Sequence, residues 1–467
     1  MSAHLGPPDA AGGRILGLDL GTSSVRALAL DASARPLPGA LARRPVTLAV
    51  DGTGAATIDP AMYLADLLDC LDELSANGWL DSVTRVAMSA QWHSVLPLDP
   101  GGTPLGPVLT WLDSRPVPPA TVTGPADVTG PADPEAFHAR TGCWWHGLYW
   151  PVRLPWLRAR LGAEFVRFVG IPEFVCAELL TEAPMSVSQA SGTGLLDIAR
   201  MDWDPEACAL GGVRPEELPP LAPRDWFGTL RPDYARRWPA LRDARWAPPV
   251  GDGAASNAGS GGVDTRHAVI TVGTSAAVRL VQPAEGRAGL RRRDGDKPAA
   301  LPYRLWRYRV DHERVVTGAA YSNGGNLYAW ARRELRLPDG EALAAALDRI
   351  EPGGGVLVDP RLGGDRPPGR TPPGSGKLSG IGFATTSVDM LAGLLYAVCR
   401  QAATDVAALE AMVEAPVEVM LGGGAVAASA WWRRAFRVAL APRRVYDVRE
   451  PEVGAVGAAL IATGLAR

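Results

Sequence analysis

Lysine is almost missing from this chain of 467 residues. Only Lys297 and Lys377 stand among 47 basic residues, so arginine carries nearly all of the positive charge. Anion recognition therefore has to use guanidinium groups or backbone amides. The Gly-Lys pair at 376–377 does not indicate a P-loop, because Leu378 stands where that motif needs a magnesium-binding Ser or Thr.

Paired cysteines, a large net charge and long apolar runs are also absent. The five cysteines are scattered without a CxxC pair, which favours a reducing compartment and argues against a structural zinc site. A formal net charge of -3 gives no electrostatic reason to expect nucleic acid or an anionic membrane as a partner. No stretch of about twenty residues is free of charges and helix breakers, so no membrane span is expected. These features predict a cytoplasmic protein.

The length and the residue pattern predict two α/β domains. A chain of 467 residues is too long for one compact core and suits two domains of roughly 200 residues each. Short apolar strands alternate with segments of helical periodicity, the clearest of which are 61–74 and 387–412. In the first of these helices, Met62 and Leu71 are expected on the same apolar face. The proline-containing stretch 245–249 precedes a glycine-rich segment, so we expect domains at 1–247 and 248–467.

The first chemical motif lies at 15–31, ILGLDLGTSSVRALALD. Two apolar strands flank a turn formed by Gly21, Thr22, Ser23 and Ser24, whose hydroxyl and amide groups suit phosphate oxygens. Asp19 would repel a bare triphosphate, so its position beside this turn indicates an intervening magnesium ion. The alternative is an ordinary hairpin with a capping Asp.

Two further motifs open the expected second domain. Asp252 lies among small residues in 250–262, VGDGAASNAGSGG, where a substrate could approach its carboxylate and lose a proton to it. The alternative is an Asp that caps a turn. Residues 270–281, ITVGTSAAVRLV, repeat the strand, hydroxyl-bearing turn and strand, with Gly273, Thr274 and Ser275 placed to bind phosphates. Arg279 is expected to be a surface residue at the end of the strand.

These motifs, in this order, resemble those of the FGGY carbohydrate kinases, a branch of the sugar kinase, actin and Hsp70 superfamily. The resemblance runs from Ile15 to Ala462 and is strongest to gluconokinase-like members, which share the GTS-x-A-V-R form. It implies two actin-like, ribonuclease H-like domains with an active-site cleft between them, ATP and magnesium as cofactors, Asp19 on the magnesium, and Asp252 as the catalytic base.

The resemblance also places sugar-binding residues in the first domain. Gln91, Trp92 and His93 follow the strand 85–88, and they resemble the Gln-Met-His of xylulokinases and gluconokinases, with Trp92 in place of Met. Such side chains offer hydrogen bonds to hydroxyls and an apolar face to sugar C–H groups. The family's Trp-x-Asp-x-Arg motif adds Trp111, Asp113 and Arg115, for which a simple ion pair is the alternative. A Thr-Gly segment with a following histidine adds His146, for which packing is the alternative.

The remaining resemblance concerns the nucleotide. Gly423 and Gly424 lie in the LGGGA run at 421–425, which resembles the family's adenosine motif, and Gly324 and Gly325 match its Asn-Gly-Gly. The motif departs from the family at 427–428, where two alanines replace polar residues.

The sequence therefore predicts ATP-dependent phosphorylation of a terminal hydroxyl on a sugar or sugar acid, most of all a gluconate-like one. A pentulose kinase such as xylulokinase is the enzymatic alternative, since the sugar motifs do not separate an acid from a ketose. The alternative of another class is a regulator that binds nucleotide or sugar without turnover. The sequence leaves a homodimer open and does not determine the substrate.

Overall fold

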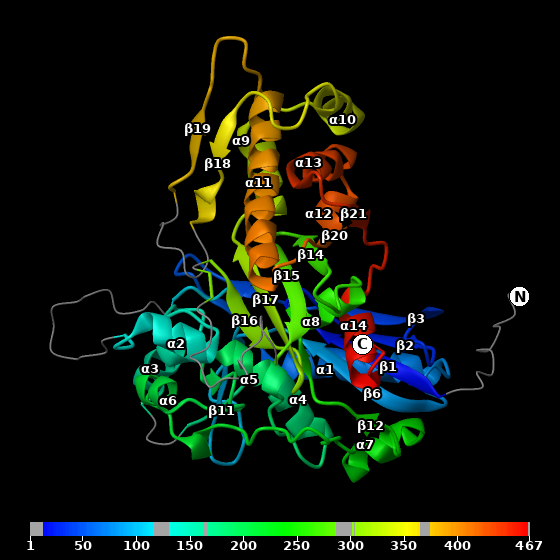
Figure 1. Ribbon diagram of the computed structural model, residues 1–467. Coiled ribbons are helices and arrows are strands. Elements are labelled where there is room, and N and C mark those ends of the chain that lie inside the picture. The colour runs from blue at the N-terminus through cyan, green and yellow to red at the C-terminus, as the bar shows by residue number, and fades with distance from the viewer. Residues whose placement is uncertain are drawn as a thin grey trace, which may run out of the picture.

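The structure is a computed structural model that describes residues 13–115, 130–162, 166–285, 301–302, 304–364 and 374–465. Figure 1 shows two α/β domains, with most of the chain's first half below and most of its second half above, while the C-terminal helix returns to the lower part. The first sheet has the strand order β12-β6-β1-β2-β3, and β13 also pairs with β6. Its strands are β1 (Arg14–Leu20), β2 (Ser24–Leu30), β3 (Pro36–Pro45), β6 (Val83–Ala90), β12 (Arg245–Trp246) and β13 (Val250–Gly251).

The second sheet repeats the plan of the first. Its order is β16-β17-β15-β14-β20-β21, and an antiparallel hairpin again lies beside a parallel strand: β14 pairs antiparallel with β15 and parallel with β20, as β1 does with β2 and β6. The strands are β14 (His267–Val272), β15 (Ala276–Pro283), β16 (Trp306–Arg309), β17 (Arg314–Tyr321), β20 (Glu418–Gly422) and β21 (Val445–Asp447). The predicted α/β fold with two related domains is confirmed.

Helices cover these sheets where the sequence predicts them. The expected helix 61–74 is α1 (Pro60–Ala76), where Asp59 accepts hydrogen bonds from the first-turn amides, and 387–412 is α11 (Ser387–Val413), capped by Thr386. The expected face of α1 was partly wrong, because Met62 is 58% exposed and Tyr63 is buried in its place. Figure 1 shows α11 running the length of the upper domain.

The other elements surround these layers. In the first domain they are α2 (Pro134–Thr141), α3 (Trp150–Leu161), α4 (Ile171–Leu179), α5 (Val187–Thr193), α6 (Pro205–Leu210), α7 (Pro232–Arg237) and the short strands β4 (Ala49–Val50), β5 (Ala56–Ile58), β7 (Leu96–Leu98), β8 (Val108–Leu109), β9 (Arg167–Val169), β10 (Leu196–Asp197) and β11 (Asp202–Trp203). In the second half they are α8 (Asp252–Gly259), α9 (Gly325–Glu334), α10 (Gly340–Asp348), β18 (Leu357–Asp359), β19 (Lys377–Ser379), α12 (Gly424–Ala427), α13 (Ala430–Leu440) and α14 (Val453–Thr463). None of the described helices combines the length and the apolar character that a membrane crossing requires.

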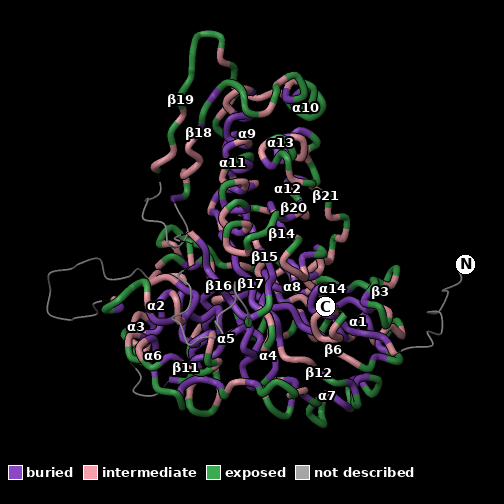
Figure 2. The backbone as a smooth tube through the Cα atoms, in the orientation of Figure 1, coloured by how far each residue is buried: buried purple, intermediate pink, exposed green. Residues whose placement is uncertain are grey.

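The two domains share a hydrophobic cluster. Each sheet has its own core, but a further buried cluster joins Trp92 and Tyr149 from the first half to Trp306 and Tyr308 of β16. Figure 2 shows that buried chain continues through the region where β16 and β17 approach the lower domain. Helix α14 also packs on α8, β1 and β6, so the C-terminal helix lies against the first sheet. The site described below lies at this junction.

Candidate active site

The first hydroxyl-bearing turn lies between β1 and β2. Ser24 begins β2 and is buried, so the turn is shorter than expected, while Ser23 is exposed. The Thr22 hydroxyl donates to Gln91 Oε1 at 3.2 Å and accepts from Trp111 Nε1 at 3.0 Å. Thr22 therefore links the turn to both sugar-motif segments.

Asp19 is a partly buried carboxylate near the end of β1. Burial raises its pKa to about 6, while Arg26 and the Ser89 hydroxyl lower it and the charges of Asp252 and Glu452 raise it. Arg26 Nη1 lies 3.5 Å from Asp19 Oδ2 and 3.0 Å from Glu452 Oε2. The negative charge of this carboxylate is only partly balanced by neighbouring positive groups. A bound cation would balance it and lower its pKa.

Asp19 would offer magnesium one carboxylate, and the ion's other ligands would have to come from substrate and water. Among the described residues no group of three metal-ligating side chains is found. Magnesium commonly takes one or two carboxylates together with phosphate oxygens and water. The chain's own residues thus fit an ion that arrives with a nucleotide.

Asp252 is the first residue of α8 and follows directly on β13. Because β13 pairs with the end of β6, at Gly251 opposite Ala90, the carboxylate stands at the same sheet edge as the sugar motif after β6. Its Oδ1 accepts the amide of the next residue, Gly253, at 2.8 Å, but the N-cap of α8 is Gly251, so Asp252 does not cap the helix. Asp252 also lines a cavity of about 150 Å³.

Residues from both domains line this cavity. They are Trp92, His93, Trp111, Leu148, Tyr149, Asp252, Ser275, Arg279, Trp306, Tyr308 and Ala320. The structure thus brings together four expected residues of the sugar and catalytic motifs, and Ser275 of the second phosphate turn.

The glycines around Asp252 make room for an indole ring. A Cβ on Gly251 would lie 1.8 Å from Trp92 Cε2, and one on Gly253 would lie 2.5 Å from Cζ3. The Trp92 indole N–H donates to the Ser188 carbonyl at 2.9 Å. The small residues beside Asp252 therefore accommodate Trp92 as well as a substrate.

His93 is held against the cavity wall in an unusual backbone conformation. Its φ is 66°, and its Nδ1 donates to the Gly192 carbonyl at 2.6 Å. The ring meets Tyr149 and Tyr308 edge-on at 5.4 and 5.6 Å. The imidazole is thus oriented by contacts from both halves of the chain.

The second wall of the cavity was not predicted from the sequence. Trp306 and Tyr308 of β16 stack at 4.4 Å, and the Tyr308 hydroxyl is 2.7 Å from that of Tyr149. Arg279 differs from its expected place at a surface strand end, because it lies in the middle of β15 and lines the cavity. The even spacing between Ser275, just before β15, and Arg279 within it could have indicated this, since residues four apart on extended chain share a face.

The other expected sugar residues lie beside the cavity but do not line it. Asp113 is buried and accepts from Arg115 Nε at 3.0 Å and from the Ala56 amide at 3.2 Å, so the ion pair weighed as an alternative is present. Gln91 is buried, and His146 Nδ1 accepts the Leu148 amide at 3.0 Å.

A residue that the sequence analysis missed aligns these segments. Arg153 of α3 is buried and donates to four carbonyl oxygens at 2.9–3.0 Å, which belong to His93, Thr110, Asp113 and Gly147. Burial lowers its pKa to about 10. One guanidinium therefore fixes the backbone of three sugar-motif segments.

Three glycine segments meet at the second phosphate turn. The Gly325 amide donates to the Gly273 carbonyl at 2.7 Å, and a Cβ on Gly324 would lie 2.7 Å from the carbonyl carbon of Ser275. Gly423 has a φ of +101°, and its Cβ position is 2.3 Å from Val272 O. Thr274 is exposed at this junction, where phosphates have access to backbone amides.

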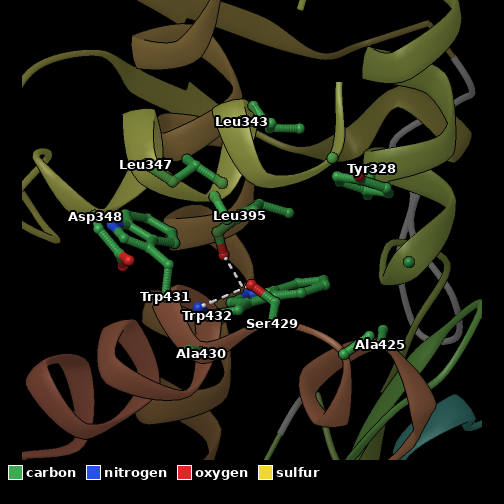
Figure 3. Close-up of a pocket in the computed structure, with 14 residues that line it drawn as sticks. Tyr328, Leu343, Leu347, Asp348, Leu395, Ala425, Ser429, Ala430, Trp431 and Trp432 are labelled. Carbon is green, nitrogen blue, oxygen red and sulfur yellow. Dashed lines mark hydrogen bonds between the residues drawn. The ribbon is translucent and has the colours of Figure 1, made fainter. Parts of the chain in front are cut away.

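A second, largely apolar cavity of about 330 Å³ lies next to this junction (Figure 3). Figure 3 shows Leu343, Leu347 and Leu395 gathered above the two tryptophans of α13. The Trp432 indole donates to the Leu395 carbonyl at 3.0 Å, and the Ser429 hydroxyl accepts the Trp432 amide at 3.2 Å. Gly325 and Ala425 both line the cavity, so the two expected adenosine segments converge here, while Gly324, Gly423 and Gly424 lie outside its lining. Such a cavity suits a planar base.

Comparisons with known proteins show the family and the fold of this chain. Residues 14–245 match the N-terminal domain of the FGGY family of carbohydrate kinases, and residues 268–465 match its C-terminal domain. The chain is 24% identical to a gluconokinase of Bacillus subtilis (strain 168), over 90% of this chain and 81% of that protein. It is 28% identical to a xylulose kinase of Streptomyces rubiginosus, over 100% and 89%. A gluconate kinase structure from Lactobacillus acidophilus superposes with a TM-score of 0.81 at 21% identity, covering 96% of this chain and 88% of that one.

Proposed function

Because this chain belongs to the FGGY family of carbohydrate kinases, we propose that it phosphorylates a terminal hydroxyl of a gluconate-like sugar acid. The family makes it a sugar kinase that uses ATP, with a pentulose as the alternative acceptor. The observation that carries the proposal is the position of Asp252, in a cavity lined by both domains and shared with Ser275.

We assign proton transfer to Asp252. Phosphoryl transfer depends on positioning and electrostatics, and a carboxylate beside the acceptor hydroxyl orients it and takes its proton. Trp92, His93 and Trp111 would hold the sugar in the same cavity. Gln91, Asp113, Arg115 and His146 do not line the cavity, and they would support it through their sequence neighbours Trp92, Trp111 and Leu148, which do.

We assign the nucleotide to the two turns and the second cavity. Thr22, Ser23, Thr274 and Ser275 would bind phosphates, and the cavity beside Gly325 and Ala425 would take the base. Magnesium, when bound through Asp19, would neutralise phosphate charge. The domain limits at 1–247 and 248–467, a homodimer and a cytoplasmic location stay predictions.

A gluconate-like acceptor is preferred over a pentulose for two reasons. The GTS-x-A-V-R form at 273–279 resembles gluconokinase-like kinases, and gluconokinases of two Bacillus species are among the relatives. Xylulose kinases match over a larger share of the chain, so the ketose remains the competing acceptor.

The test is ADP production by the purified chain with D-gluconate, D-xylulose, D-ribulose and glycerol, with and without magnesium. We expect magnesium-dependent turnover on D-gluconate. Asp252→Asn should lower kcat by about 10²–10⁴-fold with ATP binding retained, because a general base contributes that much. Asp233→Asn, at a carboxylate whose side chain is 76% exposed, is the matched control. Unchanged transfer by Asp252→Asn would remove its role, and ATP binding without turnover on any acceptor would favour a regulator.

A further inference from the structure

Arg279 reaches the cavity through gaps left by two glycines. On the neighbouring strand β17 its register partner is Gly318, whose Cβ position is 3.1 Å from Arg279 Cγ. On α8, a Cβ on Gly253 would lie 3.0 Å from Arg279 Nε. A side chain at either position would displace the guanidinium stem, so the local sequence leaves this arginine room to line the cavity.

The guanidinium of Arg279 is poorly compensated. Its Nε and Nη1 are buried and have no hydrogen-bond partner among the described residues. Burial lowers the pKa of Arg279, and the charges of Asp252 and Tyr308 raise it. Much of the surrounding wall is aromatic, formed by Trp92, Trp306 and Tyr308. A buried cation in such surroundings is stabilised by an anion that accepts its N–H groups.

The position of Arg279 along β15 separates it from the phosphate turn. Ser275 ends the turn and Arg279 lies within β15, so these two lining residues are four positions apart, or about 13 Å between Cα atoms of an extended chain. The guanidinium is thus separated from the phosphate turn and lies at the cavity wall beside Gly253, the residue after Asp252. An anion at Arg279 would therefore belong to the far end of the acceptor.

We propose that Arg279 binds the carboxylate of the sugar-acid substrate through guanidinium N–H groups that have no partner in the described part of the chain, and so determines the preference for an acid over a neutral polyol. This inference rests on the proposed function, because it requires that the acceptor carries a carboxylate. It gives Arg279 a role in specificity: the residue holds the acceptor's unreactive end while Asp252 meets the reacting hydroxyl. A guanidinium is less strongly hydrated than an ammonium group and offers donors on several edges, so it suits a buried pair with a carboxylate better.

The experiment compares D-gluconate with D-glucitol, the neutral polyol in which a CH₂OH group replaces the carboxylate. Arg279→Gln should lower kcat/KM for D-gluconate by about 100-fold, because truncating one partner of a buried charge pair costs that much. The same variant should leave kcat/KM for D-glucitol and the KM for ATP unchanged. Arg279→Lys should fall between wild type and Arg279→Gln. Arg266→Gln, at a side chain that is 79% exposed, is the matched control. Titration calorimetry of D-gluconate with the full chain gives a readout independent of turnover.

The outcomes separate the two proposals. If wild type turns over D-xylulose and neither binds nor phosphorylates D-gluconate, the acid substrate is wrong before any variant is made. If wild type uses D-gluconate and Arg279→Gln loses both acceptors equally, or shifts only the pH profile, Arg279 acts through Asp252 and the inference is wrong. A raised KM for ATP alone would place the anion on the nucleotide and would also overturn it.

Discussion

At the scale of single residues, the surroundings of Asp19 and Asp252 differ, and they suit the two carboxylates to different roles. Asp19 carries an unfavourable charge because burial and the charges of Asp252 and Glu452 outweigh Arg26 and Ser89. Asp252 instead stands at a cavity wall. The first residue suits a bound cation and the second suits a substrate hydroxyl.

Asp19→Asn should make the free protein more stable at neutral pH. The pKa of Asp19 is raised from 3.8 to about 6 in the folded protein. Between pH 3.8 and about 6 the native state therefore binds more protons than the unfolded state, so the free energy of unfolding falls as the pH rises through this range. At pH 7.5 the variant should gain up to about 3 kcal/mol in free energy of unfolding, and below pH 4 it should gain nothing. Urea unfolding without magnesium at both pH values measures this. A variant no more stable than wild type at pH 7.5 would contradict it.

At the scale of elements, the proposed nucleotide site of the second domain is built from short segments that are distant in the sequence and meet in space. The turn between β14 and β15, the start of α9 and the α12–α13 segment converge through Gly273, Gly325 and Ala425. The two alanines at 427–428 are both exposed, but only Ala428 lines the apolar cavity. This difference gives a matched pair for locating the base.

Ala428→Trp should fill the mouth of that cavity. We expect the Kd for ATP to rise by at least about tenfold, the equivalent of 1.4 kcal/mol, with binding of D-gluconate unchanged. Ala427→Trp should leave both affinities unchanged, because its side chain lies outside the lining. Calorimetric titrations of the two variants provide the comparison. Equal affinity for ATP in both would move the base to another site.

At the scale of the whole molecule, α14 joins the halves of the chain. It packs on α8 and on β1 and β6 of the first sheet. The contact with α8 is close because Gly457 has no side chain, and a Cβ there would lie 1.7 Å from the Ala255 carbonyl oxygen. The same helix passes close to Asp19, because a Cβ added at Gly454 would lie 2.8 Å from Asp19 Oδ1. The packing of α14 therefore bears directly on the proposed phosphate site.

Gly457→Ala should therefore destabilise the molecule as a whole. Forcing α14 away from α8 is an overpacking change, for which we expect a loss of about 1–3 kcal/mol in free energy of unfolding. Gly106→Ala, where a Cβ would meet nothing within 4 Å, is the control. Urea unfolding followed by tryptophan fluorescence reports both. A Gly457→Ala variant as stable as the control would show that the helix pair can separate at no cost.

The motifs themselves could be predicted from the sequence, because each is a short run whose spacing defines a turn, a strand end or a helix start. The hairpin around Gly21–Ser24, the repeat at 270–281 and the helices α1 and α11 follow from local periodicity and turn chemistry.

Only the tertiary structure decided which of these residues share a cavity. Trp92 and Trp306 are more than two hundred positions apart, and Arg279 was expected on the surface until β15 was placed against β17 and α8. Arg153 carries no recognisable motif, yet it aligns three segments through backbone carbonyls. Local patterns determine secondary structure, whereas burial and charge compensation depend on contacts between segments distant in the chain.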